Sequence, residues 1–197
     1  MNIAVFASHG GSDLQAIIDG CKNELINAKV TVVISNNSDS LALKRAKNEN
    51  IPSYHLSVKK YGNEENLAKE ILNVLSKYDV DMIFLAGYMK MLHPTIIENF
   101  HNKIFNIHPA LLPKYGGKGM YGMNVHNAVI AGHETETGVT IHRVNSEYDS
   151  GEIVAQTKVP VKTDDTAETL ADRVLEREHT FLIEVISDII SGKIALG

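Results

Sequence analysis

The fold is decided close to the N-terminus, where residues 2–13 read NIAVFASHGGSD. Residues 2–7 are mostly apolar and have the length of a buried strand. A turn with two glycines follows, and apolar residues then recur at the spacing of a helix, at Leu14, Ile17, Ile18 and Cys21. A buried strand that leads through a tight turn into an amphipathic helix is the unit from which parallel α/β sheets are built.

The same alternation continues along the chain. Further strands are predicted at 30–35, 54–56, 82–86 and 104–107, with helices near 41–47, 67–78, 95–100 and 124–131. Two strands with no helix between them, at 139–144 and 153–161, are expected to be antiparallel to each other, and a long helix then runs from Thr166 to Ile190. The sequence thus predicts a single domain over residues 1–197. Its class is α/β, a Rossmann-like three-layer fold with a mostly parallel sheet, helices on both faces and an antiparallel C-terminal strand.

The composition argues against several classes of protein. The chain has 197 residues, of which 44% are hydrophobic, a formal net charge of −5 and one cysteine. It lacks the clustered Lys and Arg that broad binding to nucleic acid or to anionic membrane requires, so neither partner is expected. Cys21 alone cannot form an internal disulfide, and the nine histidines lack metal-ligand spacing, so no metal is expected. The first apolar run is too short for a signal peptide, which predicts a cytoplasmic protein.

The turn after the first strand is a candidate phosphate site. In an open α/β sheet, ligands bind beyond the carboxyl ends of the strands. The glycines at 10 and 11 allow a ligand to approach the backbone, and the spacing of Ser12 and Gln15 predicts that Ser12 caps the next helix. Free N–H groups at a helix N-terminus suit a phosphate, although an ordinary capped turn has the same pattern.

The loops after the fourth and fifth strands carry the other candidate residues. Residues 87–92 are unusually apolar for a loop, which fits either local packing or a wall for a flat aromatic ligand. Asn106 and His108 are two apart in an extended strand, so they project to the same side. An amide donor beside an imidazole can stabilise an oxyanion and transfer a proton.

Three features of the second half are ambiguous without a structure. The glycine-rich segment 116–122 predicts either a mobile lid or a long surface connection. Asp149 lies in the turn between the last two strands and matters only if that turn folds over the ligand edge of the sheet. Glu178 lies on the apolar stripe of the last helix, where a carboxylate needs either an internal Arg or Lys partner or a ligand.

Four segments together resemble the folate-dependent formyltransferase family. They are FASHGGSDLQAI (6–17), LAGYMKML (85–92), FNIHPALLPKY (105–115) and YDSGEIVAQ (148–156). The resemblance covers residue 1 to about residue 190, and the first segment is similar to the branch that acts on glycinamide ribonucleotide. This sequence departs from the usual pattern of the family at a few positions. Asp13 stands where Asn is usual, Lys90 stands where Arg is common, and segment 116–123 is longer than in many members.

The resemblance implies a reaction and a set of site residues. It implies 10-formyltetrahydrofolate as co-substrate, 5-phosphoribosylglycinamide as acceptor, a place in purine biosynthesis, and a chain that is a monomer or a homodimer. Asn106, His108 and Asp149 match the catalytic residues. The acceptor would be bound by Gly11, Ser12, Asp13, Leu175 and Glu178. The folate would be bound by Met89, Lys90, Met91, Leu92, Asn106, Asn145, Ser146, Glu147, Tyr148 and Asp149.

Two other functions stay open on the sequence. A formyltetrahydrofolate hydrolase would use the same catalytic residues but is expected to carry an N-terminal regulatory domain. A non-enzymatic module that binds a phosphate ligand would keep the Gly10–Ser12 turn but give Asn106, His108 and Asp149 no role.

Overall fold

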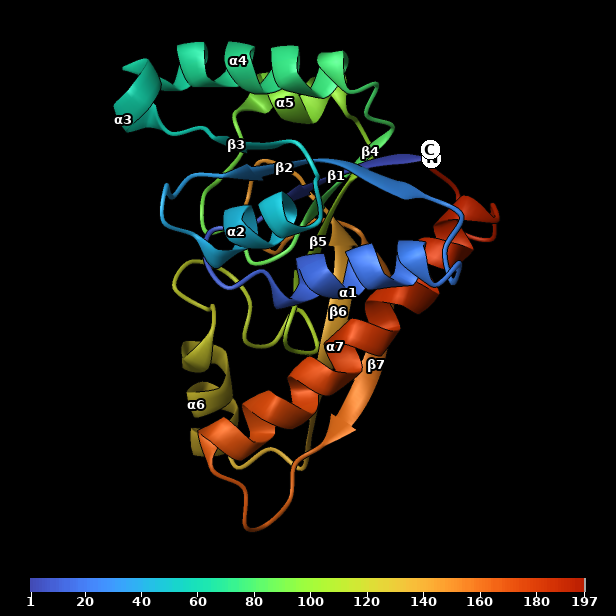
Figure 1. The fold of residues 1–197 in the computed structure, drawn as a ribbon. Coiled ribbons are helices and arrows are strands. Elements are labelled where there is room, and N and C mark those ends of the chain that lie inside the picture. The colour runs from blue at the N-terminus through green and yellow to red at the C-terminus, as the bar shows by residue number, and fades with distance from the viewer. Residues whose placement is uncertain (197) are drawn as a thin grey trace.

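A seven-stranded sheet with the order β3-β2-β1-β4-β5-β6-β7 organises the chain (Figure 1). The structure is a computed structural model that describes residues 1–196. The first five strands pair in parallel, β6 is antiparallel to β5, and β7 is antiparallel to β6. The strands are β1 (Asn2–Phe6), β2 (Lys29–Ser35), β3 (Ser53–His55), β4 (Met82–Leu85), β5 (Ile104–His108), β6 (Glu136–Arg143) and β7 (Ile153–Pro160).

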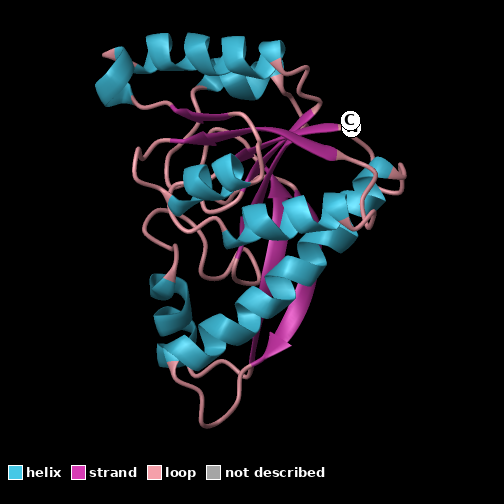
Figure 2. Cartoon of the chain, viewed as in Figure 1, coloured by secondary structure: helices cyan, strands magenta, loops and turns pink. Residues whose placement is uncertain are grey.

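Helices cover both faces of the sheet, which confirms the predicted three-layer α/β fold (Figure 2). The helices are α1 (Ser12–Lys22), α2 (Leu41–Asn48), α3 (Val58–Tyr61), α4 (Glu64–Lys77), α5 (Pro94–Asn99), α6 (Met123–Ala131) and α7 (Ala167–Ile190). Figure 1 shows α3, α4 and α5 on one side of the sheet and α1, α2, α6 and α7 on the other. No helix among residues 1–196 is both long enough and apolar enough to cross a membrane.

The alternation of side chains along β1 explains why both faces must be covered. Ile3 and Val5 pack into the core under α1 and α7, whereas Ala4 and Phe6 pack into the core under α4. All four are fully buried. A strand that is apolar on both faces is stable only between two layers of helices.

One local prediction is wrong, and one short helix is missing from the predicted elements. Ser12 is the first residue of α1 and not its cap, because Gly11 takes the cap position in a left-handed conformation (φ 68°) and no side chain caps the helix. The short helix α3 was not predicted, since its four residues show no helical periodicity. At the other end of the chain Thr166 caps α7 with a reciprocal bond to Thr169.

The β6–β7 pairing contains a β-bulge beside the end of the sheet. Ile141 faces Ala155 and His142 faces Ile153, so Val154 has no residue opposite it. Bulges re-aim the neighbouring side chains. This one lies where the antiparallel strands approach the turn that carries Asp149.

Candidate active site

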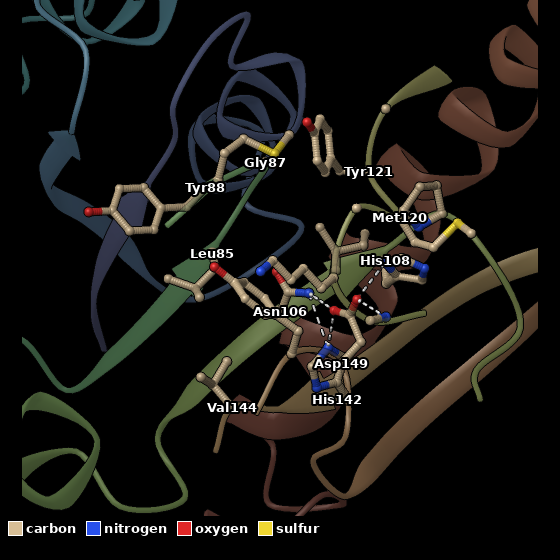
Figure 3. Close-up of a pocket in the computed structure, with 18 of the residues that line it drawn as sticks. Leu85, Gly87, Tyr88, Asn106, His108, Met120, Tyr121, His142, Val144 and Asp149 are labelled. Carbon is tan, nitrogen blue, oxygen red and sulfur yellow. Dashed lines mark hydrogen bonds and ion pairs between the residues drawn. The ribbon is translucent and has the colours of Figure 1, made fainter. Parts of the chain in front are cut away.

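A cavity of about 660 Å³ opens at the carboxyl ends of β4 and β5 (Figure 3). Its walls come from the loop after β4, the turn between β6 and β7, the glycine-rich segment 116–122 and the middle of α7. Residues far apart in the chain therefore meet at one place, where parallel strands end and helices begin. This is the edge at which open α/β sheets bind ligands.

Asn106, His142 and Asp149 form a connected cluster in the wall of this cavity (Figure 3). The Asn106 amide nitrogen lies 3.0 Å from Nε2 of His142 and 3.4 Å from Oδ1 of Asp149. Nδ1 of His142 lies 2.9 Å from the Arg143 carbonyl, to which it donates, and this leaves Nε2 to accept from Asn106. One amide N–H is thus held firmly, and the other makes only a long contact and can serve a ligand.

His108 lies on the same side of β5 as Asn106, as its spacing predicts, and is 3% exposed. Its Nε2 donates to the Tyr115 carbonyl at 2.7 Å, which leaves Nδ1 facing Oδ2 of Asp149 at 3.7 Å. Burial lowers the pKa of His108, and this effect outweighs the Asp149 charge and the Tyr115 carbonyl, which raise it. The Asp149 charge thus favours the protonated form of His108, while burial of the ring opposes it more strongly.

Asp149 is held from several sides. The Gly117 N–H donates to its Oδ2 at 2.9 Å, and its own backbone has a positive φ of 52°. Burial alone would raise the pKa of Asp149, but the contact with Nε2 of His142 at 3.5 Å, the His108 charge and the Gly117 N–H together bring it below the usual value. The turn between β6 and β7 therefore folds over the ligand edge of the sheet and presents an ionised carboxylate there. A role for Asp149 in binding or catalysis requires this position.

A buried hydrogen-bond network fixes the chain where it leaves β5. The Thr140 hydroxyl donates to the Ala110 carbonyl at 2.6 Å and accepts from the Leu112 N–H at 3.1 Å. The Gln156 amide adds bonds of 2.9 Å to Thr140 and to the Leu112 carbonyl. Strands β6 and β7 thus anchor the start of the segment that leads to Tyr115 and Gly117. Tyr115 is the hydrogen-bond partner of His108, and Gly117 is that of Asp149.

The N-terminus of α1 is anchored by α2. The Ala42 N–H donates to the His9 carbonyl at 3.1 Å, and Nε of Arg45 donates to the Gly10 carbonyl at 2.9 Å. Gly11 packs so closely on Ala42 that an added Cβ would lie 2.9 Å from its Cα. Its positive φ also favours glycine, so two independent constraints require glycine here.

Ser8 joins this turn to the loop after β4. Its hydroxyl donates to the Asn36 side chain at 2.6 Å and accepts from the Met89 N–H at 2.7 Å. The loop that the sequence shows as unusually apolar is thereby tied to β1 and faces the cavity. Met91, Tyr121, Met123 and Tyr148 are large apolar residues with exposed surface, and all four line the cavity. The apolar loop is therefore a wall of the cavity as well as a packing element.

Glu178 enters the cavity wall from α7 and has no internal cation. It is 8% exposed, and among residues 1–196 no hydrogen bond or ion pair reaches its carboxyl group. The arginines of α7 pair elsewhere, Arg173 with Asp165 and Arg177 with Glu184. Asp13 lines the same cavity from α1. Of the two interpretations of Glu178, the structure favours a ligand-facing carboxyl group.

Comparison with known proteins gives the same assignment for the whole chain. The formyl transferase family matches residues 1–186. The chain belongs to the formyl transferase family. It is 41% identical over 194 residues to the phosphoribosylglycinamide formyltransferase of Haemophilus influenzae, covering 98% of this chain and 89% of the relative. It is 35% identical to that of Escherichia coli, covering 100% and 90%. The chloroplastic phosphoribosylglycinamide formyltransferase of Arabidopsis thaliana is 42% identical, and the chain spans 66% of its length.

Solved structures of this formyl transferase family share the fold. The phosphoribosylglycinamide formyltransferase of Bacillus halodurans superposes with a TM-score of 0.90 at 31% identity, covering 98% of this chain and 97% of that one. The protein of the same name from Coxiella burnetii gives a TM-score of 0.90 at 34% identity, covering 98% and 88%. A formyltetrahydrofolate deformylase from Pseudomonas syringae, at 22% identity and a TM-score of 0.84, shares the fold alone.

Most of the residues expected in a formyl transferase site line the cavity. The three expected catalytic residues do, and so do the expected folate residues except Ser146, which is exposed outside it. Of the expected acceptor residues, Asp13, Leu175 and Glu178 line the cavity, whereas Gly11 and Ser12 lie beside it. His142 was missed, because a lone histidine in a strand carries no signal until the register places it opposite Asn106.

Proposed function

We propose that the chain transfers the formyl group of 10-formyltetrahydrofolate to the amine of 5-phosphoribosylglycinamide, giving formylglycinamide ribonucleotide and tetrahydrofolate in purine biosynthesis. The observation that carries the proposal is the Asn106–His142–Asp149 cluster with His108 at the wall of a cavity large enough for both ligands. Relatives named phosphoribosylglycinamide formyltransferase that match almost the whole chain support it.

The reaction needs only positioning, an oxyanion donor and proton transfer. The acceptor amine attacks the formyl carbon, and the carbonyl oxygen takes the negative charge of the tetrahedral intermediate. The free N–H of Asn106 donates to that oxygen, and Nδ1 of His108 adds a second donor when the ring takes up a proton, which the Asp149 charge favours and burial opposes. Asp149, held ionised, accepts the proton lost by the amine, directly or through water. The intermediate collapses by breaking the bond to N10 of the folate, which leaves with a proton.

The two ligands would enter from opposite walls. The apolar loop 89–92 and the turn 145–149 offer a slot for the flat pterin ring. Gly11, Ser12 and Asp13 at the start of α1, with Leu175 and Glu178 of α7, would bind the acceptor, whose phosphate suits the free N–H groups of the helix N-terminus. In this arrangement the formyl carbon and the amine meet beside Asn106.

A continuous absorbance assay tests the function. The protein is mixed with 10-formyl-5,8-dideazafolate, and deformylation is followed with and without 5-phosphoribosylglycinamide. Product that depends on the ribonucleotide is expected. Product without it would identify a hydrolase, and binding of the ribonucleotide without turnover would identify a binding module. Asn106→Ala and Asp149→Ala should lower kcat far more than they change KM, and unchanged turnover in both would refute the assigned roles.

The remaining features of the proposal concern partners and location. We expect small-molecule substrates only, no nucleic acid, no membrane and no metal, and either a monomer or a homodimer. A cytoplasmic location is also a prediction, while the plant relative from Arabidopsis thaliana is named as chloroplastic.

A further inference from the structure

Tyr115 has a backbone conformation that bulky residues rarely adopt. Its φ is 56°, in the left-handed region, where a residue with a large side chain is strained. It lies seven residues after His108, at the start of the glycine-rich segment. Strain of this kind persists only where the surroundings hold it, so the contacts of Tyr115 show what this conformation serves.

The side chain of Tyr115 is held by the loop just after α6. Its hydroxyl donates to Oε1 of Glu134 at 2.9 Å, and Nζ of Lys114 donates to the same oxygen at 2.9 Å. The hydroxyl also packs against the backbone of Gly132, where an added Cβ would collide with it. Lys114 and Tyr115 both lower the pKa of Glu134, so the acceptor is an ionised carboxylate at neutral pH. A hydrogen bond to an ionised acceptor is stronger than one between neutral groups, which suits a bond that opposes backbone strain.

The backbone of Tyr115 reaches the other way, to the reaction cluster. Its carbonyl accepts from Nε2 of His108 at 2.7 Å, which requires the proton on Nε2, and Nδ1 then faces Oδ2 of Asp149 at 3.7 Å. Two residues further on, the Gly117 N–H donates to the same Oδ2 at 2.9 Å. Between them, an added Cβ at Gly116 would lie only 3.3 Å from Cβ of Asp149. The turn 115–117 therefore contacts both side chains to which the proposed function gives proton-transfer roles.

We propose that Tyr115 is a positioning residue, whose hydroxyl bond to Glu134 holds its carbonyl on His108 and so fixes which ring nitrogen carries the proton. With the proton on Nε2, Nδ1 is free to take up a proton and then donate it. Without the hydroxyl bond the backbone can relax from the left-handed region, and its carbonyl moves away from the ring. The Asp149 carboxylate then draws the proton to Nδ1, which can no longer accept one. The consequence for catalysis rests on the proposed function, whereas the hold on His108 does not.

The first measurement reads the tautomer of His108 without any ligand. Histidine labelled with ¹⁵N distinguishes protonated from unprotonated ring nitrogens, and the His108 signals are assigned by their loss in His108→Gln. In the wild type we expect the proton on Nε2. Tyr115→Phe keeps the ring and removes only the hydroxyl, so the Nδ1 tautomer should appear. The titration midpoint of His108 should also fall, by about 0.5 pH unit or more, because the Tyr115 carbonyl raises this pKa.

Variants at Glu134 and Lys114 separate this bond from its surroundings. Glu134→Ala removes the acceptor and should reproduce the effect of Tyr115→Phe. Glu134→Gln keeps an amide oxygen that can accept from the hydroxyl, so it should restore most of the Nε2 tautomer. The matched control is Lys114→Met, which removes a donor to the same Oε1 oxygen, leaves the Tyr115 bond in place and should not change the tautomer.

The second measurement separates kcat from KM in the dideazafolate assay. Tyr115→Phe and Glu134→Ala should each lower kcat about tenfold, a part of the roughly 10²–10⁴ that a positioned proton-transfer group contributes, with KM for both substrates within about twofold. The double variant should be no slower than the slower single variant within about threefold, because both changes break the same bond. Lys114→Met should keep the wild-type kcat.

Three results would overturn the inference. They are a His108 tautomer and midpoint that both Tyr115→Phe and Glu134→Ala leave unchanged, a kcat that both leave unchanged, and a double variant in which the two losses multiply. Should Tyr115→Phe not fold, Glu134→Ala decides, because it changes a partly exposed side chain of a loop. Absence of ribonucleotide-dependent formylation in the wild type would instead refute the proposed function, and the ligand-free spectra would still decide whether Tyr115 holds His108.

Discussion

Replacing His142 with phenylalanine tests whether this residue acts through Asn106. Phenylalanine keeps a ring in a site that is 2% exposed but removes the Nε2 acceptor 3.0 Å from the Asn106 amide. The amide is then free to turn away from the oxyanion. Complete loss of an oxyanion donor costs about 10²–10³ in kcat, so loss of its orientation alone should cost about 10–10², with KM nearly unchanged. The lost bond to the Arg143 carbonyl should cost about 1 kcal/mol of stability.

The assay is a double-mutant cycle followed by the dideazafolate absorbance change. His142→Phe, Asn106→Ala and the double variant are compared at saturating concentrations of both substrates. Because His142 is expected to act chiefly through the Asn106 amide, the double variant should be no slower than Asn106→Ala within about threefold. A double variant that is slower than Asn106→Ala by the full factor that His142→Phe costs alone, so that the two losses multiply, would refute the reasoning and give His142 a direct role.

Three further predictions concern the cavity and its frame. Gly11→Ala should lower stability by about 1–3 kcal/mol in urea unfolding, because its backbone has a positive φ and its Cβ would crowd Ala42; an unchanged midpoint would contradict this. Asp149→Asn should move the NMR titration of His108 to lower pH, because the Asp149 charge raises the His108 pKa; an upward shift would contradict it. Asp165→Asn should be less stable at neutral pH, because the bond to Arg173 holds the pKa of Asp165 well below 3.8; the deficit should shrink as the pH falls below that value, and a deficit independent of pH would count against this cause.

Much of the fold follows from periodicity alone. The sequence predicts each of the seven strands and six of the seven helices to within a few residues, because apolar runs and helical stripes are strong in a sheet buried on both faces. The cap of α1 was mispredicted because Ser12 and Gln15 have capping-box spacing, while the close packing of Gly11 on Ala42 decides the local backbone. That contact joins residues 31 positions apart and leaves no trace in local spacing.

The site was predictable where its residues lie on one strand and not where they meet across strands. Asn106 and His108 are two apart, so their common direction is visible in the sequence. His142 joins them only because β6 pairs antiparallel with β5 in the register that sets it opposite Asn106. The direction of the His108 pKa was also beyond the sequence, since it depends on how deeply the ring is buried.

The hairpin of β6 and β7 restricts where residues can be inserted or deleted within the family. The hairpin of β6 and β7 places His142 beside Asn106 from the last turn-side residues of β6, and it places Asp149 in the same cluster from its turn. If a residue were inserted or deleted between His142 and Asp149, one of the two side chains would point away from the cluster. The backbone at Gly151 packs so tightly on the Arg143 carbonyl that an added Cβ would collide with it, so the hairpin has no room for an extra residue here. Insertions are therefore expected outside this hairpin, while the chemistry keeps the hairpin itself at constant length.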